Sequence, residues 1–158
     1  MPVNTKIVQG CRELKFGSLD EVVVDAEQLV ASPNTRVLGN WPLSQLLTHL
    51  TTAINGSIDG IPAKAPWFIR LIGPLIKRRI LKNGMSPGFR LPKAAEAGFY
   101  PIVASPQVAL EGLRAAVGRS HTEQMIAPHP VLGKLTHKEW TQMHLRHAEL
   151  HLSFAVPN

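Results

Sequence analysis

A stretch near the C-terminus, residues 135–154, reads L-T-H-K-E-W-T-Q-M-H-L-R-H-A-E-L-H-L-S-F and predicts an amphipathic helix. Thr136 and Glu139 have the spacing of a capping box, and Leu135 and Trp140 stand at the positions of a hydrophobic staple. At about 100° per residue, one arc of this helix combines apolar side chains with three histidines. The members of the arc are Trp140, Met143, His144, His147, Leu150, His151 and Phe154.

Histidines in a stripe that should face the core need partners, because a buried imidazole costs free energy unless both ring nitrogens are satisfied. One interpretation is that they hydrogen-bond to neighbouring helices. The spacing favours another, since His147 and His151 lie four residues apart and can direct two ring nitrogens at one metal ion. A third ligand must then come from elsewhere. The opposite arc supplies no expected ligand and consists of Gln142, Arg146, Glu149 and Ser153.

The composition is that of one globular domain, which we expect to span residues 1–158 with an irregular segment at 1–17. The chain has 158 residues, of which 44% are hydrophobic, enough to build a core. Its single cysteine, Cys11, excludes a disulfide framework and a cysteine-based zinc site, and fits a reducing cytoplasm. No secretory signal is recognised, and no apolar run approaches the roughly 20 residues that span a bilayer.

The basic net charge is a weak indication of function. The formal charge is +6, but the basic residues are scattered except at 77–82. Few aromatic side chains are available for base stacking, with one Tyr and three Trp in the chain. We therefore expect a solvated basic face and no nucleic-acid partner.

Two helices are predicted in the first third of the chain. The first begins at a capping box of Ser18 and Glu21 and ends at the S-P-N break near residues 31–34. The second takes Asn40 as its cap, has a proline in its first turn, and ends at the N-G pair of residues 55–56. Both carry apolar residues at helical spacing.

His49 lies toward one edge of the apolar stripe of the second helix. An edge position suits a side chain that reaches sideways to a neighbouring helix. The alternative is a partly exposed histidine without a role. A further helix is predicted from Ser105, a cap followed by a proline at the first helical position, to about Ser120.

The region between the second and third of these helices, residues 57–104, is harder to interpret. Apolar pairs at helical spacing run from Trp67 to Ile80, but Gly73 and Pro74 should kink or split that helix. The turn-rich sequence after it reads as a long ordered loop, a type of segment that often covers a functional site. The whole pattern predicts an all-α protein, an antiparallel four-helix bundle with a long helical insertion between its second and third helices.

Three segments carry a resemblance to a known group of proteins. They are W-P-L-S-Q-L-L-T-H-L at 41–50, H-P-V-L-G-K-L-T-H-K-E-W at 129–140 and H-L-R-H-A-E-L-H at 144–151. Together they resemble the DinB/YfiT-like metalloenzyme superfamily, in particular a bacterial branch known chiefly as a domain of unknown function. The likeness runs from about Ser18 to Phe154. It implies a four-helix bundle whose metal is held by one histidine of the second helix and two of the last.

When the ligand pattern of these proteins is applied to this chain, the resemblance implies that His49, His147 and His151 bind a divalent ion (Zn, Ni or Fe). Many relatives carry H-x-x-H-H, whereas this chain has Ala148 in place of the last histidine. His144 therefore becomes a residue that supports the ligands, or an alternative ligand. The family often has a glutamine three residues after the final histidine, where this chain has a phenylalanine.

The neighbourhood of the predicted metal offers few other groups. His129 is expected close to it, although its turn with Pro130 is more readily explained as orienting the last helix. No carboxylate stands out as a general base. Glu123 and Asp25 are candidates for that role, and His144 and His129 are at least as good candidates for a place near the metal.

The resemblance implies metal-activated thiol or water chemistry, because characterised members of the superfamily include thiol-dependent transferases and hydrolases. We expect a small-molecule substrate, a thiol among the candidates, and a homodimer as one oligomeric state. Two alternatives compete with this hypothesis. One is a non-catalytic module that contacts a membrane surface or a partner through the basic and apolar segment 64–82, which more often simply covers a core. The other is a bundle whose histidines only form a pH-sensitive core.

Overall fold

Helices make up most of the chain that the computed structural model describes, which comprises residues 2–62, 66–88 and 105–157. The expectation of an all-α protein is confirmed in that the described chain is mostly helical. Residues 2–17 form no helix or strand, and the predicted long loop lies largely outside the described residues. The elements, in order, are α1 (Leu19–Ala31), β1 (Arg36–Val37), α2 (Leu43–Asp59), α3 (Trp67–Asn83), α5 (Pro106–Thr122), α6 (His137–Leu152) and β2 (Ala155–Val156).

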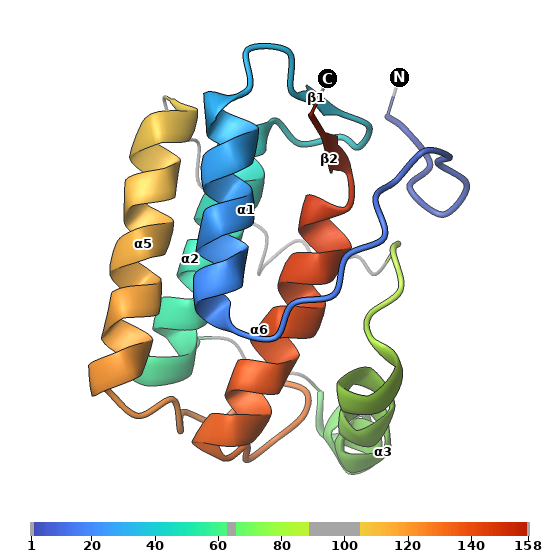
Figure 1. Ribbon diagram of the computed structural model, residues 1–158. Coiled ribbons are helices and arrows are strands. Elements are labelled where there is room, and N and C mark those ends of the chain that lie inside the picture. Colours follow the sequence, from blue (N-terminus) through green and yellow to red (C-terminus); the bar gives the residue numbers. More distant parts are fainter. Residues whose placement is uncertain (1, 63–65, 89–104, 158) are drawn as a thin grey trace.

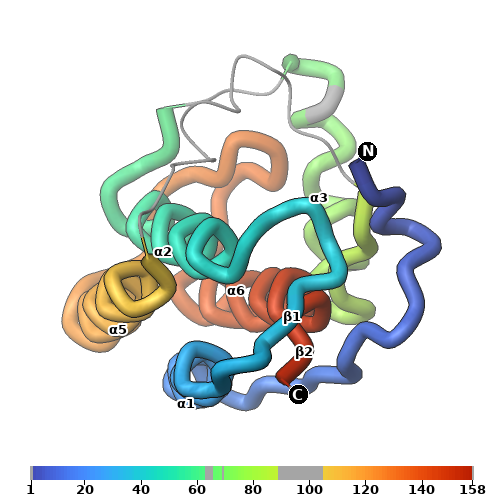
Figure 2. Tube along the Cα trace, turned by 90° about the horizontal axis from the view of Figure 1, so that it is seen from above, coloured from blue at the N-terminus to red at the C-terminus, as the bar shows by residue number. Residues whose placement is uncertain are grey.

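The core lies between α1, α2, α5 and α6. Each of α1 and α2 packs on both α5 and α6, while α3 packs on α6 from outside this group (Figures 1 and 2). The colours of Figure 1 show that α1 and α6 run in one direction and α2 and α5 in the other. Each of the four helices contributes a side chain that is at most 1% exposed, namely Val22, Leu47, Leu113 and Trp140.

The two short strands tie the connection between α1 and α2 to the end of α6. They pair antiparallel, with Arg36 opposite Val156 and Val37 opposite Ala155. The backbone N–H of Leu38 extends this pairing by donating to the carbonyl of Phe154 at 2.9 Å. The segment just before α2 is thereby held beside the last turn of α6.

The helix starts that the sequence predicts from capping boxes are confirmed. At α1, the Ser18 hydroxyl accepts from the backbone N–H of Glu21 at 3.3 Å. At α6, the Thr136 hydroxyl accepts from the N–H of Glu139 at 3.2 Å, and the Glu139 carboxylate accepts from the N–H of Thr136 at 2.9 Å. Reciprocal capping of this kind satisfies two donors that the first helical turn leaves free.

Both predicted ends of the second helix are wrong. Asn40 does not cap α2, because its side chain instead pairs with the backbone of Val3, accepting at 2.6 Å and donating at 2.9 Å. The helix also continues through Gly56 to Asp59. A Cβ on Gly56 would lie 2.8 Å from the side chain of Ile61, so this glycine serves packing rather than helix termination.

Of the two outcomes expected at Gly73-Pro74, a kink or a split, the split does not occur, since α3 runs as one helix from Trp67 to Asn83. A Cβ on Gly73 would collide with the backbone carbonyl of Val131. Glycine is therefore needed here so that the loop before α6 can lie directly on α3. None of the described helices is both long enough and apolar enough to cross a bilayer.

The arc of α6 that points away from the histidines is partly covered by other segments, although Gln142 within it is exposed. The N-terminal segment runs along it, where the N–H of Phe16 donates to the Glu149 carboxylate at 2.9 Å. Arg146, which is 8% exposed, donates to the same carboxylate at 2.7 Å. The Gln142 side chain donates to the carbonyl of Leu81 in α3 at 3.0 Å. This cover fixes the rotation of α6 and so the direction of its histidine face.

Candidate metal centre

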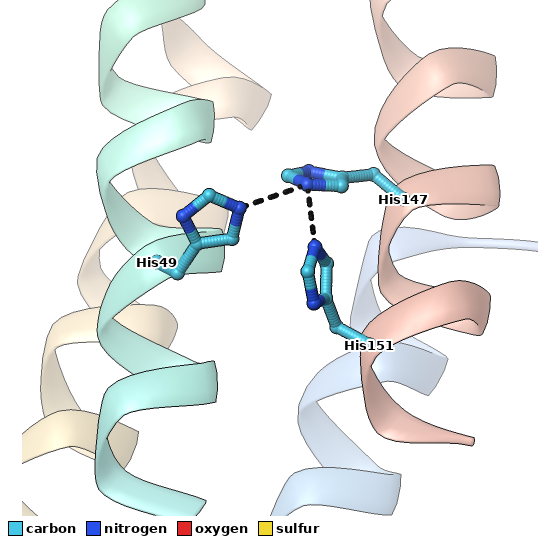
Figure 3. A group of neighbouring side chains, drawn as sticks. All are labelled: His49, His147 and His151. Atoms are coloured by element: carbon cyan, nitrogen blue, oxygen red, sulfur yellow. Dashed lines mark hydrogen bonds between the residues drawn. The ribbon is translucent and has the colours of Figure 1, made fainter. Parts of the chain in front are cut away.

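Three histidines from two helices converge on one point between α2 and α6 (Figure 3). His49 comes from α2, and His147 and His151 come from successive turns of α6. Nε2 of His147 lies 3.0 Å from Nε2 of His49 and 3.0 Å from Nε2 of His151. One ring nitrogen from each residue lies within 4.8 Å of the others. The structure thus brings together the three residues named from the sequence.

Hydrogen bonding alone does not satisfy these nitrogens well. A ring nitrogen of neutral imidazole carries either a hydrogen or one lone pair, never both. Nε2 of His147 therefore cannot donate to one neighbour and accept from the other, although it lies 3.0 Å from both. If it carries a lone pair, two donors must share it. A cation that accepts one lone pair from each ring satisfies all three nitrogens.

The spacing of two of the three nitrogen pairs also suits a small divalent ion. Nitrogen ligands about 2.0–2.1 Å from one ion lie roughly 3.3 Å apart in a tetrahedron and roughly 2.9 Å apart at a right angle. Nε2 of His147 is 3.0 Å from each neighbouring Nε2. Three protein ligands in either geometry leave at least one coordination position for another group.

Burial keeps the α6 imidazoles neutral. It lowers the pKa of His151 to about 3, with a further contribution from the neighbouring His49 ring. The pKa of His147 is lowered well below its usual value, by burial first and then by the surrounding imidazoles. A metal ligand must be deprotonated, so both side chains hold the required form at neutral pH.

Trp41 forms one wall of the cluster. Its ring stacks on His151 with centroids 5.5 Å apart and planes 7° apart, and it meets His49 edge-on at 5.1 Å. Trp41 lies in the segment that β1 and β2 hold against the end of α6. It therefore restricts the ring orientation of two of the three histidines. In the sequence, Trp41 stands out only as the first residue of the W-P-L-S-Q-L-L-T-H-L segment.

The comparison with known families identifies the chain. A family model described as "Protein of unknown function (DUF1569)" matches residues 8–158. The protein belongs to the DUF1569 family. No curated protein and no solved structure matches it. The family description assigns no activity, so the geometry of the site is the guide to function.

In this DUF1569 protein His144 is turned toward Ser57 and not into the cluster. Its Nε2 lies 3.0 Å from the Ser57 hydroxyl, which donates its own hydrogen to the carbonyl of Ile54 at 2.6 Å. The hydroxyl oxygen must then accept, so Nε2 of His144 carries the hydrogen and Nδ1 carries the lone pair. Nδ1 of His144 and Nδ1 of His147 are both buried and have no hydrogen-bond partner among the described residues.

His129 serves the loop before α6 in the DUF1569 chain. Its Nδ1 accepts from the backbone N–H groups of Val131 and Leu132 at 3.1 and 3.0 Å. Its ring lies 5.5 Å from that of Trp140, which in turn stacks on His144 at 5.2 Å. Burial lowers the pKa of His129 to about 4. These contacts favour the interpretation that the turn orients the last helix.

The carboxylates considered from the sequence are engaged elsewhere. Glu123 forms an ion pair with Arg119 at 2.8 Å, and Asp25 pairs with Arg12 at 2.7 Å. Glu149 lies on the covered arc of α6, as expected for a residue that is not a ligand. Across residues 2–62, 66–88 and 105–157, no carboxylate joins the three-histidine group.

Proposed function

We propose that this DUF1569 protein is a DinB-like metalloenzyme. In this proposal α1, α2, α5 and α6 form the four-helix bundle of that superfamily, and His49, His147 and His151 hold one divalent ion. The reaction is a transfer or hydrolysis in which a thiol or water attacks a small-molecule substrate. The observation that carries the proposal is the convergence of three Nε2 atoms, two pairs of them 3.0 Å apart.

The chemistry of the donor set supports this reading over a purely structural core. Neutral imidazoles with converging lone pairs are the form in which histidine binds a metal. When bound, such an ion lowers the pKa of a water or thiol at its open position and polarises a carbonyl. The protein contributes a rigid arrangement, because two ligands lie on consecutive turns of one helix and Trp41 holds two of the rings.

The absence of a carboxylate from the three-histidine group, within the described residues, favours a thiol as the activated nucleophile. A nucleophile from which no carboxylate removes the proton ionises when its own pKa is lowered. A free thiol has a pKa of about 8.5, whereas that of bulk water is about 15.7, so a thiol needs a far smaller shift.

Metal analysis of the purified protein tests the proposal directly. We expect about one divalent ion per chain, as isolated or after reconstitution. We also expect a strong chelator to lower the midpoint of thermal unfolding, because an ion bound only to the folded state stabilises it. No bound ion in either preparation would refute the proposal. A midpoint of thermal unfolding that does not respond to chelator, but decreases as the pH falls below 6, would favour the alternative in which the histidines only form a pH-sensitive core.

His144 is expected to support the ligand His147. A histidine that binds a metal through Nε2 carries a hydrogen on Nδ1, and metal-bound histidines normally donate that hydrogen to an acceptor. The lone pair on Nδ1 of His144, one turn away on the same helix, has no partner among the described residues, and neither does Nδ1 of His147, so a small adjustment of the rings on metal binding would let the two atoms pair. We expect His144→Ala to weaken metal affinity about 10- to 100-fold, measured by competition with a chelating dye.

Two conservative variants separate this role from folding. In His144→Asn the amide oxygen stands near the position of Nδ1. The metal affinity of this variant should therefore be closer to that of the unmodified protein than the affinity of His144→Ala is. In His144→Gln the amide reaches toward Ser57, so stability should be retained while affinity falls. Unchanged affinity in His144→Ala would show that His144 only packs beside the site.

A further inference from the structure

α3 carries a large apolar surface that faces solvent. Five of its large apolar side chains are 50–73% exposed. The other described helices expose at most one such residue each, Val24 in α1 and Val108 in α5. The exposed residues of α3 are Trp67, Phe68, Leu71, Ile72 and Leu75.

This surface is separate from the one that attaches α3 to the rest of the molecule. Ile76, Ile80 and Leu81 are half-buried and pack against the core. At about 100° per residue, the five exposed residues fall within an arc of roughly 140° on the other side of the helix. Lys77 also fixes α3 to α6 through an ion pair with Glu139 at 2.9 Å. The outward apolar arc is therefore not needed to hold α3 in place.

The charges of α3 are all positive. Its sequence, W-F-I-R-L-I-G-P-L-I-K-R-R-I-L-K-N, contains no aspartate or glutamate. Arg78, Arg79 and Lys82 are exposed and continue the same arc in the last turns of the helix. The outward face is thus apolar in its first half and cationic in its second half.

A groove with the same character lies beside this face. It has a volume of about 450 Å³ and runs between α3 and the loop before α6. The loop comes closest to α3 at Gly73, next to Pro74 of the groove. The residues that line the groove are all apolar, glycine or cationic, namely Trp67, Arg70, Leu71, Pro74, Lys77, Leu132, Gly133 and Lys134.

We propose that α3 binds the surface of a membrane that contains anionic phospholipid. The apolar first half of the arc enters the boundary between headgroups and acyl chains, with Trp67 near the interface. The cationic second half and the groove beside it bind lipid phosphates. The surface complements both parts of such a lipid, whereas a nucleic acid would leave the apolar half of the arc in water.

A second copy of the chain fits this surface less well. Pairing two α3 helices would cover the apolar residues but leave Arg78, Arg79 and Lys82 of both copies without an opposite charge. Each copy also carries a formal net charge of +6. An anionic bilayer covers the apolar residues and neutralises the cations at the same time. The proposal is independent of the metal site and should hold for metal-free protein.

Flotation of the full chain with lipid vesicles tests the proposal. We expect it to float with vesicles of phosphatidylcholine and phosphatidylglycerol, not with phosphatidylcholine alone, and less at high salt. The double variant Leu71→Glu/Leu75→Glu should lower vesicle binding by about tenfold or more, because both side chains are exposed and apolar. The matched control is Val108→Glu on α5, where valine is 59% exposed and binding should not change.

The double variant Arg78→Glu/Arg79→Glu should bind anionic vesicles less. Its helical content, measured by circular dichroism, should not change. No flotation of the unmodified chain with anionic vesicles would overturn the proposal. The proposal would also be overturned if the double variant Leu71→Glu/Leu75→Glu floated with anionic vesicles as well as the unmodified chain does. A lipid-free dimer that the same double variant converts to monomer would assign the surface to a second copy instead.

Discussion

Replacing His147 with alanine is expected to abolish stoichiometric metal binding. Nε2 of His147 is the nitrogen that lies 3.0 Å from both other Nε2 atoms, so its loss leaves one ligand on each of two helices. Loss of a group that merely supports a ligand costs about 10- to 100-fold in affinity, and loss of a ligand should cost more. Bound metal per chain and competition with a chelating dye measure the effect.

The matched control is His121→Ala. His121 is an exposed histidine on α5 that pairs with Asp20 at 3.1 Å and is not a member of the three-histidine group. The variant His121→Ala should bind metal like the unmodified protein. The variants His49→Ala and His151→Ala should lose stoichiometric metal binding, as His147→Ala does. Retention of a full equivalent of metal by His147→Ala, in protein with unchanged helical content, would disprove this ligand set.

Much of the last helix and its site follows from local sequence rules. The capping box fixes where α6 begins, and helical periodicity then places His147 and His151 on one face. The edge position of His49 on α2 correctly suggested a side chain that reaches toward a neighbour. These features depend on residues within a few turns of one another, so the sequence alone was sufficient to predict them.

The wall that Trp41 forms could not be predicted in the same way. Its position depends on the pairing of β1 with β2, which joins Arg36 to Val156 across most of the chain. Two residues per strand leave no alternation pattern that would reveal a sheet. The stacking of Trp41 on His151 is therefore a consequence of tertiary structure.

Local rules failed at α2 for a related reason. Asn40 is a good capping residue, but the distant backbone of Val3 supplies a donor and an acceptor that match its amide. Gly56 is a common helix terminator, but here contact with Ile61 requires a residue without a side chain. In both cases a contact with another segment outweighed a local preference worth roughly 1 kcal/mol.

Replacing Trp140 with alanine is expected to cause a large loss of stability. The side chain is 0% exposed, and its Nε1 donates to the carbonyl of Ala127 at 3.0 Å. Its ring also stacks on His144 with centroids 5.2 Å apart. Removing a buried aromatic ring of this size typically lowers the free energy of unfolding by about 3–5 kcal/mol. Urea unfolding of metal-free protein measures the change without a contribution from bound metal.

Two variants divide this loss into its parts. Trp140→Phe keeps most of the buried ring but leaves the carbonyl of Ala127 without its donor, which should cost about 1–3 kcal/mol. Trp67→Ala removes the same side chain from a position that is 73% exposed, and should change stability by only about 0.5 kcal/mol. If Trp140→Ala cost no more than Trp67→Ala, the burial of Trp140 and its hydrogen bond to Ala127 would contribute little to holding the loop before α6 on the core. The direction of the histidine face would then depend chiefly on the cover that the N-terminal segment and α3 place over α6.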